Sequence, residues 1–406
     1  MATIVEEPSV GYPPELAAYA GRINDADAHE WVPPELWVEI FGEVTRPFAD
    51  LDFHNLRAMK KNYFKDVDSD IQNKLSFRSA WRGKGPYAYG AYDLDRRIEL
   101  MDFLGVDKQM IFPGNLVINA LFLLGNADVP EFFPQITGNR RAYAIKMLRA
   151  QNEWVVRSQK WSDRLRPVAV LVGETPDEIY QEAKSLIDKG VRAMWFPSSM
   201  LPGGKSPAHE ELDRMWALLA GNNVAAATHI GNEASFFRTL DWREAAAFKG
   251  FLMGEEIELD PWTVSTVHLP SMNFLIAVVA GGVFERHPML RFGAIETGAH
   301  WLGGIAHNMD MWSRDAKASK LWVDRLPLKP SEYIRRNVRI TAFPWEPVDK
   351  YINDNGLAEC YCYASDFPHV EGGTDPMHHW SKRLAPLGKD VVEGFFSNNA
   401  KWLMPQ

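Results

Sequence analysis

The chain has 406 residues, with 44 Lys+Arg against 53 Asp+Glu for a formal net charge of -9, and 46% of its residues are hydrophobic. This is the balance of a soluble globular protein with enough apolar material for a large core. The acidic balance, without a basic cluster, argues against nucleic-acid binding. The N-terminus carries acids where a signal peptide needs bases, and the longest apolar run, 274–284, is too short to span a bilayer. We therefore expect a cytoplasmic protein without a membrane segment.

Short apolar runs bounded by turn residues alternate with helical patterns along the chain. Most of these runs lack polar alternation, as expected for strands of a parallel sheet that is covered on both faces. The clearest helix follows the third run, where Thr175 and Glu178 form a capping box, Pro176 takes the first helical position and Gly190 ends the pattern. We predict eight strands, at 23–28, 108–112, 168–172, 193–196, 224–229, 292–296, 338–341 and 361–365.

The order of these elements predicts an α/β fold. A strand, a capped helix and a second strand make a βαβ unit with a right-handed crossover. Eight such strands favour a single-domain (β/α)₈ TIM barrel over a doubly wound sheet. We expect residues 1–22 to form an N-terminal arm and residues 23–406 to form the barrel. The long interval 30–107, rich in aromatic residues, is then an insertion over the barrel mouth, although a solvent-covering excursion without chemistry fits the same composition.

Four of the predicted strands lead into histidines or carboxylates. In a barrel, the carboxyl ends of the strands meet at one mouth. Each residue alone has a simpler explanation, such as an Asx turn or a strand cap. Buried together without a cation, however, the carboxylates would each cost several kcal/mol. Imidazole and carboxylate donors suit Zn, Mn or Fe. The residues concerned are Asp25, Asp27 and His29 on the first strand, His229 on the fifth, Glu296 on the sixth, and Asp366 and His369 after the eighth.

Five motifs occur in a characteristic order along the chain. They are D-A-D-A-H followed by P-P-E-L-W, R-L-R-P-V-A-V-L, T-H-I-G, F-E-R-H-P-M-L-R-F-G-A-I-E-T-G-A-H-W and A-S-D-F-P-H-V-E-G. Together they resemble the amidohydrolase superfamily, and within it the amidohydrolase-2 group that includes aminocarboxymuconate-semialdehyde decarboxylase and γ-resorcylate decarboxylase. The resemblance extends from residue 23 to residue 402.

By position, the resemblance implies that one divalent metal is held by Asp27, His29, His229 and Asp366, and that Asp366 also accepts a proton. The sequence departs from the family pattern at two places. Aspartate at position 27 replaces the first histidine of H-x-H, which shifts the preference from Zn toward Mn or Fe. Glu296 stands where several decarboxylases have a catalytic histidine, so it is either an acid/base or a ligand of a second metal. The family also implies a homo-oligomer.

Further residues near these motifs are weaker candidates. His300 follows Glu296 closely and is a candidate catalytic residue, whereas His307 is better explained as a core histidine. Arg82 and Lys84 in the insertion are candidates to pair with a substrate carboxylate, although exposed bases are usually solvated. The candidate ligands of a second metal are Glu30, Glu296, His300 and His369.

The leading functional hypothesis is a metal-dependent hydrolase or decarboxylase of a small carboxylated or carbonyl substrate. In hydrolysis, Asp366 takes the proton of water. In decarboxylation, an acid residue, with Glu296 as the candidate, protonates the adjacent carbon. The surplus of histidines and carboxylates leaves open a dinuclear Fe/Fe or Mn/Fe oxygenase or hydroxylase. A third alternative is one subunit of a hetero-oligomer with a paralogous chain.

Overall fold

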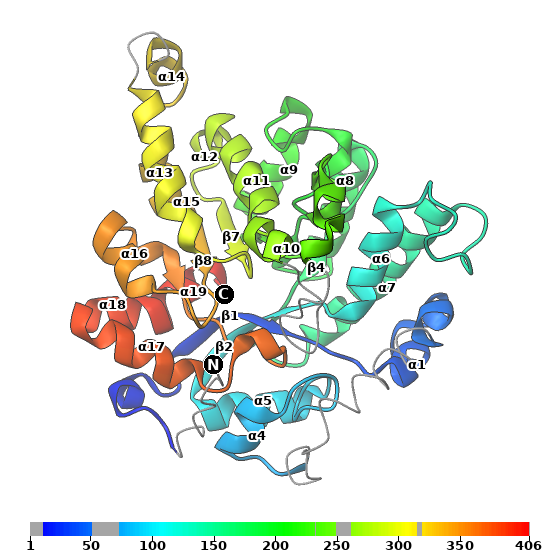
Figure 1. Cartoon of the computed structure of the whole chain (residues 1–406), viewed down its shortest axis with the longest axis horizontal. Helices are drawn as coiled ribbons and strands as arrows, with labels where there is room; N and C mark the ends of the chain where they lie inside the picture. Colours follow the sequence, from blue (N-terminus) through cyan, green and yellow to red (C-terminus); the bar gives the residue numbers. More distant parts are fainter. Residues whose placement is uncertain (1–10, 51–72, 232, 249–260, 315–318, 406) are drawn as a thin grey trace.

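The structure is a computed structural model of the full chain and describes residues 11–50, 73–231, 233–248, 261–314 and 319–405. Within these ranges the strands lie at the centre and helices surround them (Figure 1). The strands are β1 (Ile23–His29), β2 (Val106–Phe112), β3 (Leu165–Pro167), β4 (Ala169–Val170), β5 (Ala193–Trp195), β6 (Ala225–His229), β7 (Arg291–Ile295), β8 (Val338–Thr341) and β9 (Tyr361–Cys362). The helices are α1 (Trp37–Phe41), α4 (Phe77–Arg82), α5 (Leu94–Leu104), α6 (Asn115–Gly125), α7 (Arg140–Ser158), α8 (Pro176–Asp188), α9 (Asp213–Gly221), α10 (Pro261–Thr266), α11 (Leu269–Ala280), α12 (Val283–Arg286), α13 (His300–Ser313), α14 (Ser319–Arg325), α15 (Pro330–Asn337), α16 (Val348–Asn355), α17 (Pro376–Leu384), α18 (Lys389–Glu393) and α19 (Asn399–Leu403).

The described strands form two parallel sheets, ordered β1-β2-β3 and β4-β5-β6-β7-β8-β9. Only Val168 separates β3 from β4, and its N–H donates to the carbonyl of Ile111 on β2. At the other end of the series, Ala28 on β1 forms a parallel bridge with Phe367, beyond β9. The α/β class with parallel strands is therefore confirmed, while closure of the two sheets into one barrel stays a prediction.

Each predicted strand overlaps an observed one, and the differences lie at the ends. The third prediction, 168–172, overlaps β4 and misses β3, because the chain changes partner strand at Val168, from β2 to β5. The eighth ends at Cys362, because the next N–H groups bond outside the sheet. Tyr363 donates to the carbonyl of Phe395, and Ser365 donates to the side chain of Asp25. These partners lie far away in the sequence, so the local pattern could not reveal them.

Helix α8 follows the predicted capping with a shift of one residue. The hydroxyl of Thr175 accepts from the N–H of Glu178 at 3.2 Å, as predicted. The carboxylate of Glu178 accepts from the N–H of Glu174, one residue before the cap. Gly190, with φ of +99°, follows the helix. The helix buries the apolar face that the sequence indicated, Ile179, Ala183, Leu186 and Ile187.

The stretch Pro261–Ala280, which contains α10 and α11, is 20 residues long with a mean hydropathy of 1.4, enough by length and composition alone to cross a membrane. A core helix of a soluble protein passes the same test. Here α11 packs into the hydrophobic core through Phe274, Leu275, Val278 and Val279. Packing in the core therefore accounts for part of its apolar character, since 33% of the most apolar window is buried.

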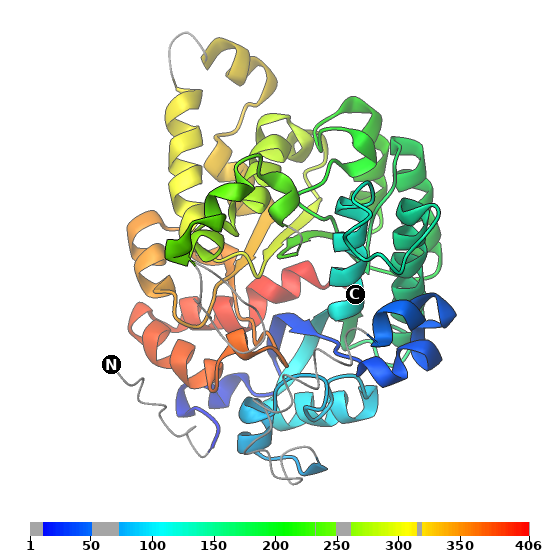
Figure 2. The ribbon, with the colours of Figure 1, turned by 45° about the vertical axis from the view of Figure 1, so that its right-hand side comes forward.

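Figure 2 shows α13 and α14 projecting from the rest of the molecule. His307 lies on this part of α13 and is exposed. The prediction of a core histidine at this position was therefore wrong, because the opposite face of the helix, with Leu302, Ala306 and Met309, carries the packing.

The structure describes parts of the predicted N-terminal arm, 1–22, and of the predicted insertion, 30–107. Residues 11–22 of the predicted arm include a 3-10 helix, Pro14–Tyr19, whose Leu16 is fully buried. Residues 1–10 and 51–72 lie outside the described residues. Within the predicted insertion, the N–H of Gly85 donates to the carbonyl of Pro368 at 2.9 Å. This contact brings the insertion against the loop that follows β9. The division of the chain into arm and barrel stays a prediction.

Candidate metal centre

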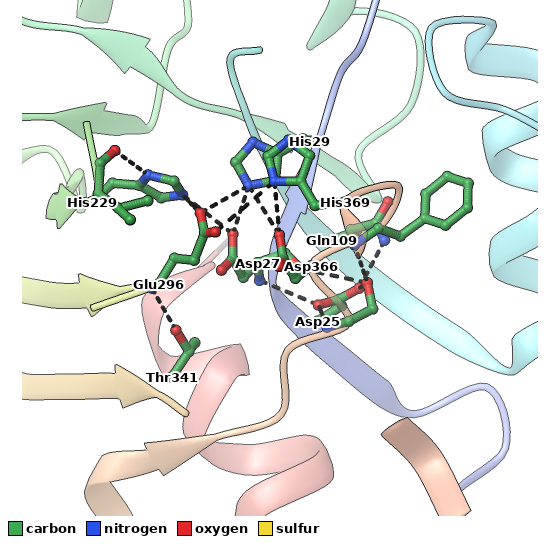
Figure 3. Close-up of polar contacts among 12 residues, drawn as sticks. Asp25, Asp27, His29, Gln109, His229, Glu296, Thr341, Asp366 and His369 are labelled. Carbon is green, nitrogen blue, oxygen red and sulfur yellow. Dashed lines mark hydrogen bonds and ion pairs between the residues drawn. The ribbon is translucent and has the colours of Figure 1, made fainter. Parts of the chain in front are cut away.

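Five buried side chains converge where strands end (Figure 3). Asp27 and His29 lie on β1, and His229 is the last residue of β6. Glu296 directly follows β7, and Asp366 follows β9. Parallel strands present their carboxyl ends at one edge, which is why residues from distant parts of the chain meet there. None of the five is more than 6% exposed.

The donor atoms of these side chains approach one another closely. His29 Nε2 lies 3.4 Å from both Glu296 Oε2 and Asp366 Oδ1, and 3.5 Å from Asp27 Oδ1. His229 Nε2 lies 3.0 Å from Glu296 Oε2 and 3.6 Å from Asp27 Oδ1. With bonds of about 2.1 Å, two ligands of one metal lie roughly 3.0 Å apart at a right angle and roughly 3.4 Å apart at the tetrahedral angle. The spacing fits the ligand shell of one cation.

None of these donor atoms has a hydrogen-bond partner among the described residues. A buried polar atom left without a partner costs about 1–3 kcal/mol, and more if it is charged. A divalent cation would satisfy all of these atoms at once, and their mixture of imidazole nitrogen and carboxylate oxygen fits Zn, Mn or Fe. The atoms are Asp27 Oδ1, His29 Nε2, His229 Nε2, Glu296 Oε2 and Asp366 Oδ1; we call them the donor group.

The ring of His229 is oriented for ligation. Its Nδ1 lies 2.8 Å from the carbonyl of Ile230, which can only accept, so Nδ1 carries the hydrogen. Nε2 then presents its lone pair to the donor group once the ring is neutral. The ring also stacks on Phe112, with centroids 4.4 Å apart, and contacts Trp195.

The histidines and carboxylates of the donor group shift one another's pKa values strongly. Burial lowers the pKa of His229, but the charge of Glu296 and the contact with Asp27 raise it by more, to about 9. Burial raises the pKa of Glu296, whereas His229 and His29 lower it by more, to well below its usual range. The pKa of His29 is likewise raised, because Asp27, Asp366 and Glu296 outweigh its burial. Without a cation, the histidines therefore hold the protons and Glu296 stays ionised.

His369 forms the more open side of the site. Its ring stacks on His29 with centroids 3.8 Å apart and meets Trp31 edge-on. Its Nδ1 lies 3.1 Å from Asp366 Oδ1 and 3.9 Å from Glu296 Oε1, and its side chain is 18% exposed. With His29, Glu296 and Asp366 it makes a second set of potential ligands that shares members with the donor group.

Two of the carboxylates stand on left-handed backbone. Glu296 has φ of +51° and Asp366 has φ of +50°, a conformation that costs a non-glycine residue about 1–3 kcal/mol. Neighbouring groups hold both turns in place. The N–H of Glu296 donates to the hydroxyl of Thr341, and the N–H of Asp366 donates to the carbonyl of Asp27, each at 2.8 Å. The strand ends thus turn sharply at the donor group.

A polar layer next to the donor group joins Asp25 to two residues that the sequence did not single out, Arg97 and Gln109. Arg97 on α5 is 1% exposed and donates to the carbonyl of His29 at 2.6 Å and to Gln109 Oε1 at 3.2 Å. Gln109 Nε2 in turn donates to Asp25 Oδ2 at 2.8 Å. Burial lowers the pKa of Arg97 to about 10 and raises that of Asp25 to about 6, the latter against hydrogen bonds from Ser365 and Gln109. The sequence signal that could have revealed this layer is the single arginine on the otherwise apolar buried face of α5.

Two predicted site residues lie apart from the donor group. Both oxygens of Glu30 accept from neighbours: Oε1 from the N–H of Gly114 and from Gln151, and Oε2 from the N–H of Val32. His300, with a side chain 48% exposed, begins α13 and places Nδ1 3.6 Å from Glu346 Oε2. Neither residue belongs to either set of potential ligands among the described residues.

The basic candidates of the insertion are placed differently. Lys84 is 8% exposed and precedes Gly85, which bonds to Pro368 in the loop that carries Asp366. Arg82, the last residue of α4, is partly exposed. The structure therefore brings the backbone next to Lys84 to the site without defining a role for either base.

Comparison with known proteins places the chain in a family. The family model described as amidohydrolase matches residues 110–404. No curated protein sequence matches the chain. Among solved structures, an amidohydrolase from Mycobacterium avium subsp. paratuberculosis K-10 has 20% identity and a TM-score of 0.58, covering 77% of this chain and 74% of that one.

Two further similar structures are decarboxylases. The 5-carboxyvanillate decarboxylase from Sphingomonas paucimobilis has 15% identity and a TM-score of 0.57, covering 94% of this chain and 98% of that one. The 5-carboxyvanillate decarboxylase from Novosphingobium aromaticivorans DSM 12444, solved with bound manganese and 3-methoxy-4-hydroxy-5-nitrobenzoic acid, has 15% identity and a TM-score of 0.57, covering 98% and 99%. These likenesses show a shared fold. Because the family model covers well over half of the chain, the protein belongs to the amidohydrolase family and is a metal-dependent enzyme of that family.

Proposed function

We propose that this enzyme is a metal-dependent decarboxylase of a small carboxylated substrate, built on a closed (β/α)₈ barrel with residues 30–107 over its mouth. The observation that carries the proposal is the donor group, whose five buried atoms make no hydrogen bond among the described residues and have the spacing of ligands around one cation. Hydrolysis of a carbonyl substrate is the second reaction that this site supports.

The donor group would hold one divalent cation through Asp27, His29, His229, Glu296 and Asp366. Three carboxylates with two imidazoles make a harder ligand set than three histidines, which favours Mn or Fe over Zn. When bound, such a cation polarises a substrate oxygen or lowers the pKa of water. Glu296 belongs to the ligand set on this account, because its Oε2 faces His229 Nε2 at 3.0 Å.

We assign proton transfer to Asp366 and His369, because Asp366 Oδ1 and His369 Nδ1 are 3.1 Å apart. In decarboxylation, the bond between the carboxylate carbon and its neighbour breaks and CO₂ leaves. The electron pair stays on the neighbouring carbon, which takes a proton. His369 is the more exposed member of the site, so it is placed to exchange that proton with solvent. In hydrolysis, Asp366 takes a proton from the attacking water.

Aromatic rings around the site favour a flat substrate. Trp31 meets His369 edge-on, and Phe112 and Trp195 contact His229. The similar structures include enzymes named for aromatic carboxylates, 5-carboxyvanillate and 2,6-dihydroxybenzoate. These observations support a carboxylated phenol or a related conjugated acid as the substrate class.

The second set of potential ligands supports an alternative, a dinuclear oxygenase or hydroxylase. This set contains His29, Glu296, Asp366 and His369. His29 Nε2 has one lone pair and can bind only one ion, so a second ion would depend on His369 and the remaining carboxylate oxygens. The number of metal ions per chain therefore separates the two functions.

The test is elemental analysis combined with assays of CO₂ release, ester or lactone hydrolysis and oxygen consumption. The proposal predicts one Mn, Fe or Zn per chain and CO₂ release from at least one carboxylated phenol without oxygen uptake. Two iron-group ions per chain with oxygen uptake would establish the oxygenase instead. Hydrolysis without CO₂ release would leave the metal site in place and change the reaction.

We also propose that the enzyme works as a soluble cytoplasmic homo-oligomer. Light scattering on the purified chain measures its mass directly. A monomer that becomes active only on addition of a paralogous chain would support the hetero-oligomeric alternative.

A further inference from the structure

We propose that Asp25 is a positioning residue for the metal centre: its carboxylate joins the first strand to the segment after the last strand and thereby sets the spacing of the ligands Asp27 and Asp366. This inference rests on the proposed metal site and concerns a residue that does not itself belong to the donor group. Asp25 is 1% exposed and lies beside that group, on the side of Gln109 and away from His229 (Figure 3).

The Asp25 carboxylate accepts four hydrogen bonds. Its Oδ2 accepts from the hydroxyl of Ser365 at 2.6 Å and from Gln109 Nε2 at 2.8 Å. Its Oδ1 accepts from the N–H of Ser365 at 2.9 Å and from the N–H of Asp27 at 3.2 Å. The carboxylate of Asp25 thus binds Ser365, which lies 340 positions further along the sequence.

Of the three residues that donate to Asp25, Asp27 is a proposed ligand and Ser365 is next to one. Ser365 immediately precedes Asp366, and its hydroxyl accepts from the N–H of Phe367 at 3.2 Å. The N–H of Asp366 donates to the carbonyl of Asp27 at 2.8 Å. Asp366 also needs support because its backbone is left-handed. Moving Ser365 would therefore move Asp366 relative to Asp27.

The surroundings of Asp25 require a carboxylate rather than an amide. All four groups that face it are donors. The orientation of Gln109 is fixed, since its Oε1 accepts from Arg97 and its NH₂ must then face Asp25. Asparagine at position 25 would turn its own NH₂ toward at least one of these donors, at almost unchanged volume.

The decisive experiment measures cobalt binding, with Co²⁺ as the probe, in the wild type and in Asp25→Asn. We expect the dissociation constant to rise about 10–100-fold, the usual effect of losing a group that orients ligands. We also expect a changed visible absorption spectrum, because that spectrum depends on the arrangement of the ligands. A purely structural role would lower the melting temperature of Asp25→Asn without changing the cobalt spectrum.

A matched control is Glu346→Gln. Glu346 is another buried carboxylate whose hydrogen-bond partners are neutral protein donors, the N–H groups of Ala299, His300 and Phe343 and the hydroxyl of Tyr351. This variant should lose stability and keep the wild-type affinity for cobalt and the wild-type spectrum.

Ser365→Ala provides a second test that holds even if Asp25→Asn does not fold. It removes the hydroxyl donor at 2.6 Å and leaves the backbone N–H bond to Asp25. Weaker cobalt binding with a changed spectrum is expected, and Ser365→Thr, which keeps a hydroxyl, should restore both. If Ser365→Ala and every folded Asp25→Asn protein match the wild type in affinity and spectrum, the positioning role is refuted while the metal site stands. A wild type that takes up no cobalt would refute both proposals.

Discussion

Two groups of histidines and carboxylates lie near the strand ends of this enzyme, and they differ in how their oxygens are used. In the donor group, Glu296 Oε2 and Asp366 Oδ1 are buried and accept no hydrogen bond from the described residues, of which only histidine rings approach them. In the second group, formed by His268, His300 and Glu346, every carboxylate oxygen accepts hydrogen bonds from backbone N–H groups. Glu346 thereby caps the first turn of α13.

The comparison shows that residue type alone does not define a metal site. Both groups contain imidazole and carboxylate at close range, but in the second the carboxylate is already satisfied and the His300 ring is half exposed. A cation gains most where burial is high and hydrogen bonds are absent. Changes in the donor group should therefore alter metal binding, whereas changes in the second group should leave it unaltered.

The largest difference is expected between His229→Ala and His300→Ala. Loss of the His229 ligand should weaken metal binding by more than about 100-fold, the upper range seen when only a supporting group is removed. Decarboxylase activity should fall with it. His300→Ala should keep the metal affinity of the wild type, as measured by competition with a chelator. Equal losses in the two variants would abolish the distinction between the groups.

Removing the metal from the wild type should have the next largest effect. A ligand at a hundred times its dissociation constant stabilises the folded state by about 2.7 kcal/mol. A chelator should therefore lower Tm by several degrees, and added Mn²⁺ should restore it. In His29→Ala the chelator should have no effect on Tm. A wild-type Tm that is indifferent to chelator and metal would argue against ligands left unsatisfied in the donor group.

Metal binding should also depend on pH. In the metal-free protein the pKa of His229 is raised to about 9, so the ring is protonated at pH 7 and must release its proton when it binds a cation. The apparent affinity should rise with pH, by up to about tenfold per unit for each proton displaced, and level off near pH 9. Calorimetry in buffers of different ionisation enthalpy measures the protons released.

The raised pKa of His229 has the opposite effect on the stability of the metal-free protein, which should fall as the pH rises. Because the folded-state pKa of His229 lies above its usual value of 6.5, its stabilising contribution is fully present below pH 6.5 and is lost as the pH rises through 9. Chelator-treated protein should thus lose stability over this range in urea titrations. Metal affinity that does not change between pH 6.5 and 9 would contradict the charge distribution described for the donor group.

The smallest effect is expected from Glu346→Gln. The loss should be about 1 kcal/mol of unfolding free energy, typical of a weakened helix cap, and should be visible in urea titration. Metal content should stay at the wild-type level. Loss of metal from this variant would link the two groups, which the comparison keeps separate.

The sequence revealed the residues of the donor group better than their roles. The period of a strand and the common edge of parallel strands singled out Asp25 together with Asp27, His29, His229 and Asp366. The resemblance to the amidohydrolase family implied which four of them are ligands. Glu296 was left between acid/base and second-metal ligand, because the direction of its side chain depends on a left-handed turn. His300 lies four residues beyond it, but the start of α13 turns its ring toward Glu346.

Features that depend on distant partners were not predicted. The interruption between β3 and β4 comes from a change of partner strand at Val168. The layer of Arg97, Gln109 and Asp25 joins β1, β2 and α5, and no local pattern shows that these side chains meet. Such contacts appear only when the chain is folded.

The most direct test of the central claim is a crystal structure of the enzyme grown with Mn²⁺, with anomalous scattering recorded at the manganese edge. The account predicts a single strong peak within bonding distance of His29 Nε2, His229 Nε2 and the oxygens of Asp27, Glu296 and Asp366. A map without a peak among these atoms, or with the ion bound at His300 and Glu346 instead, would contradict it.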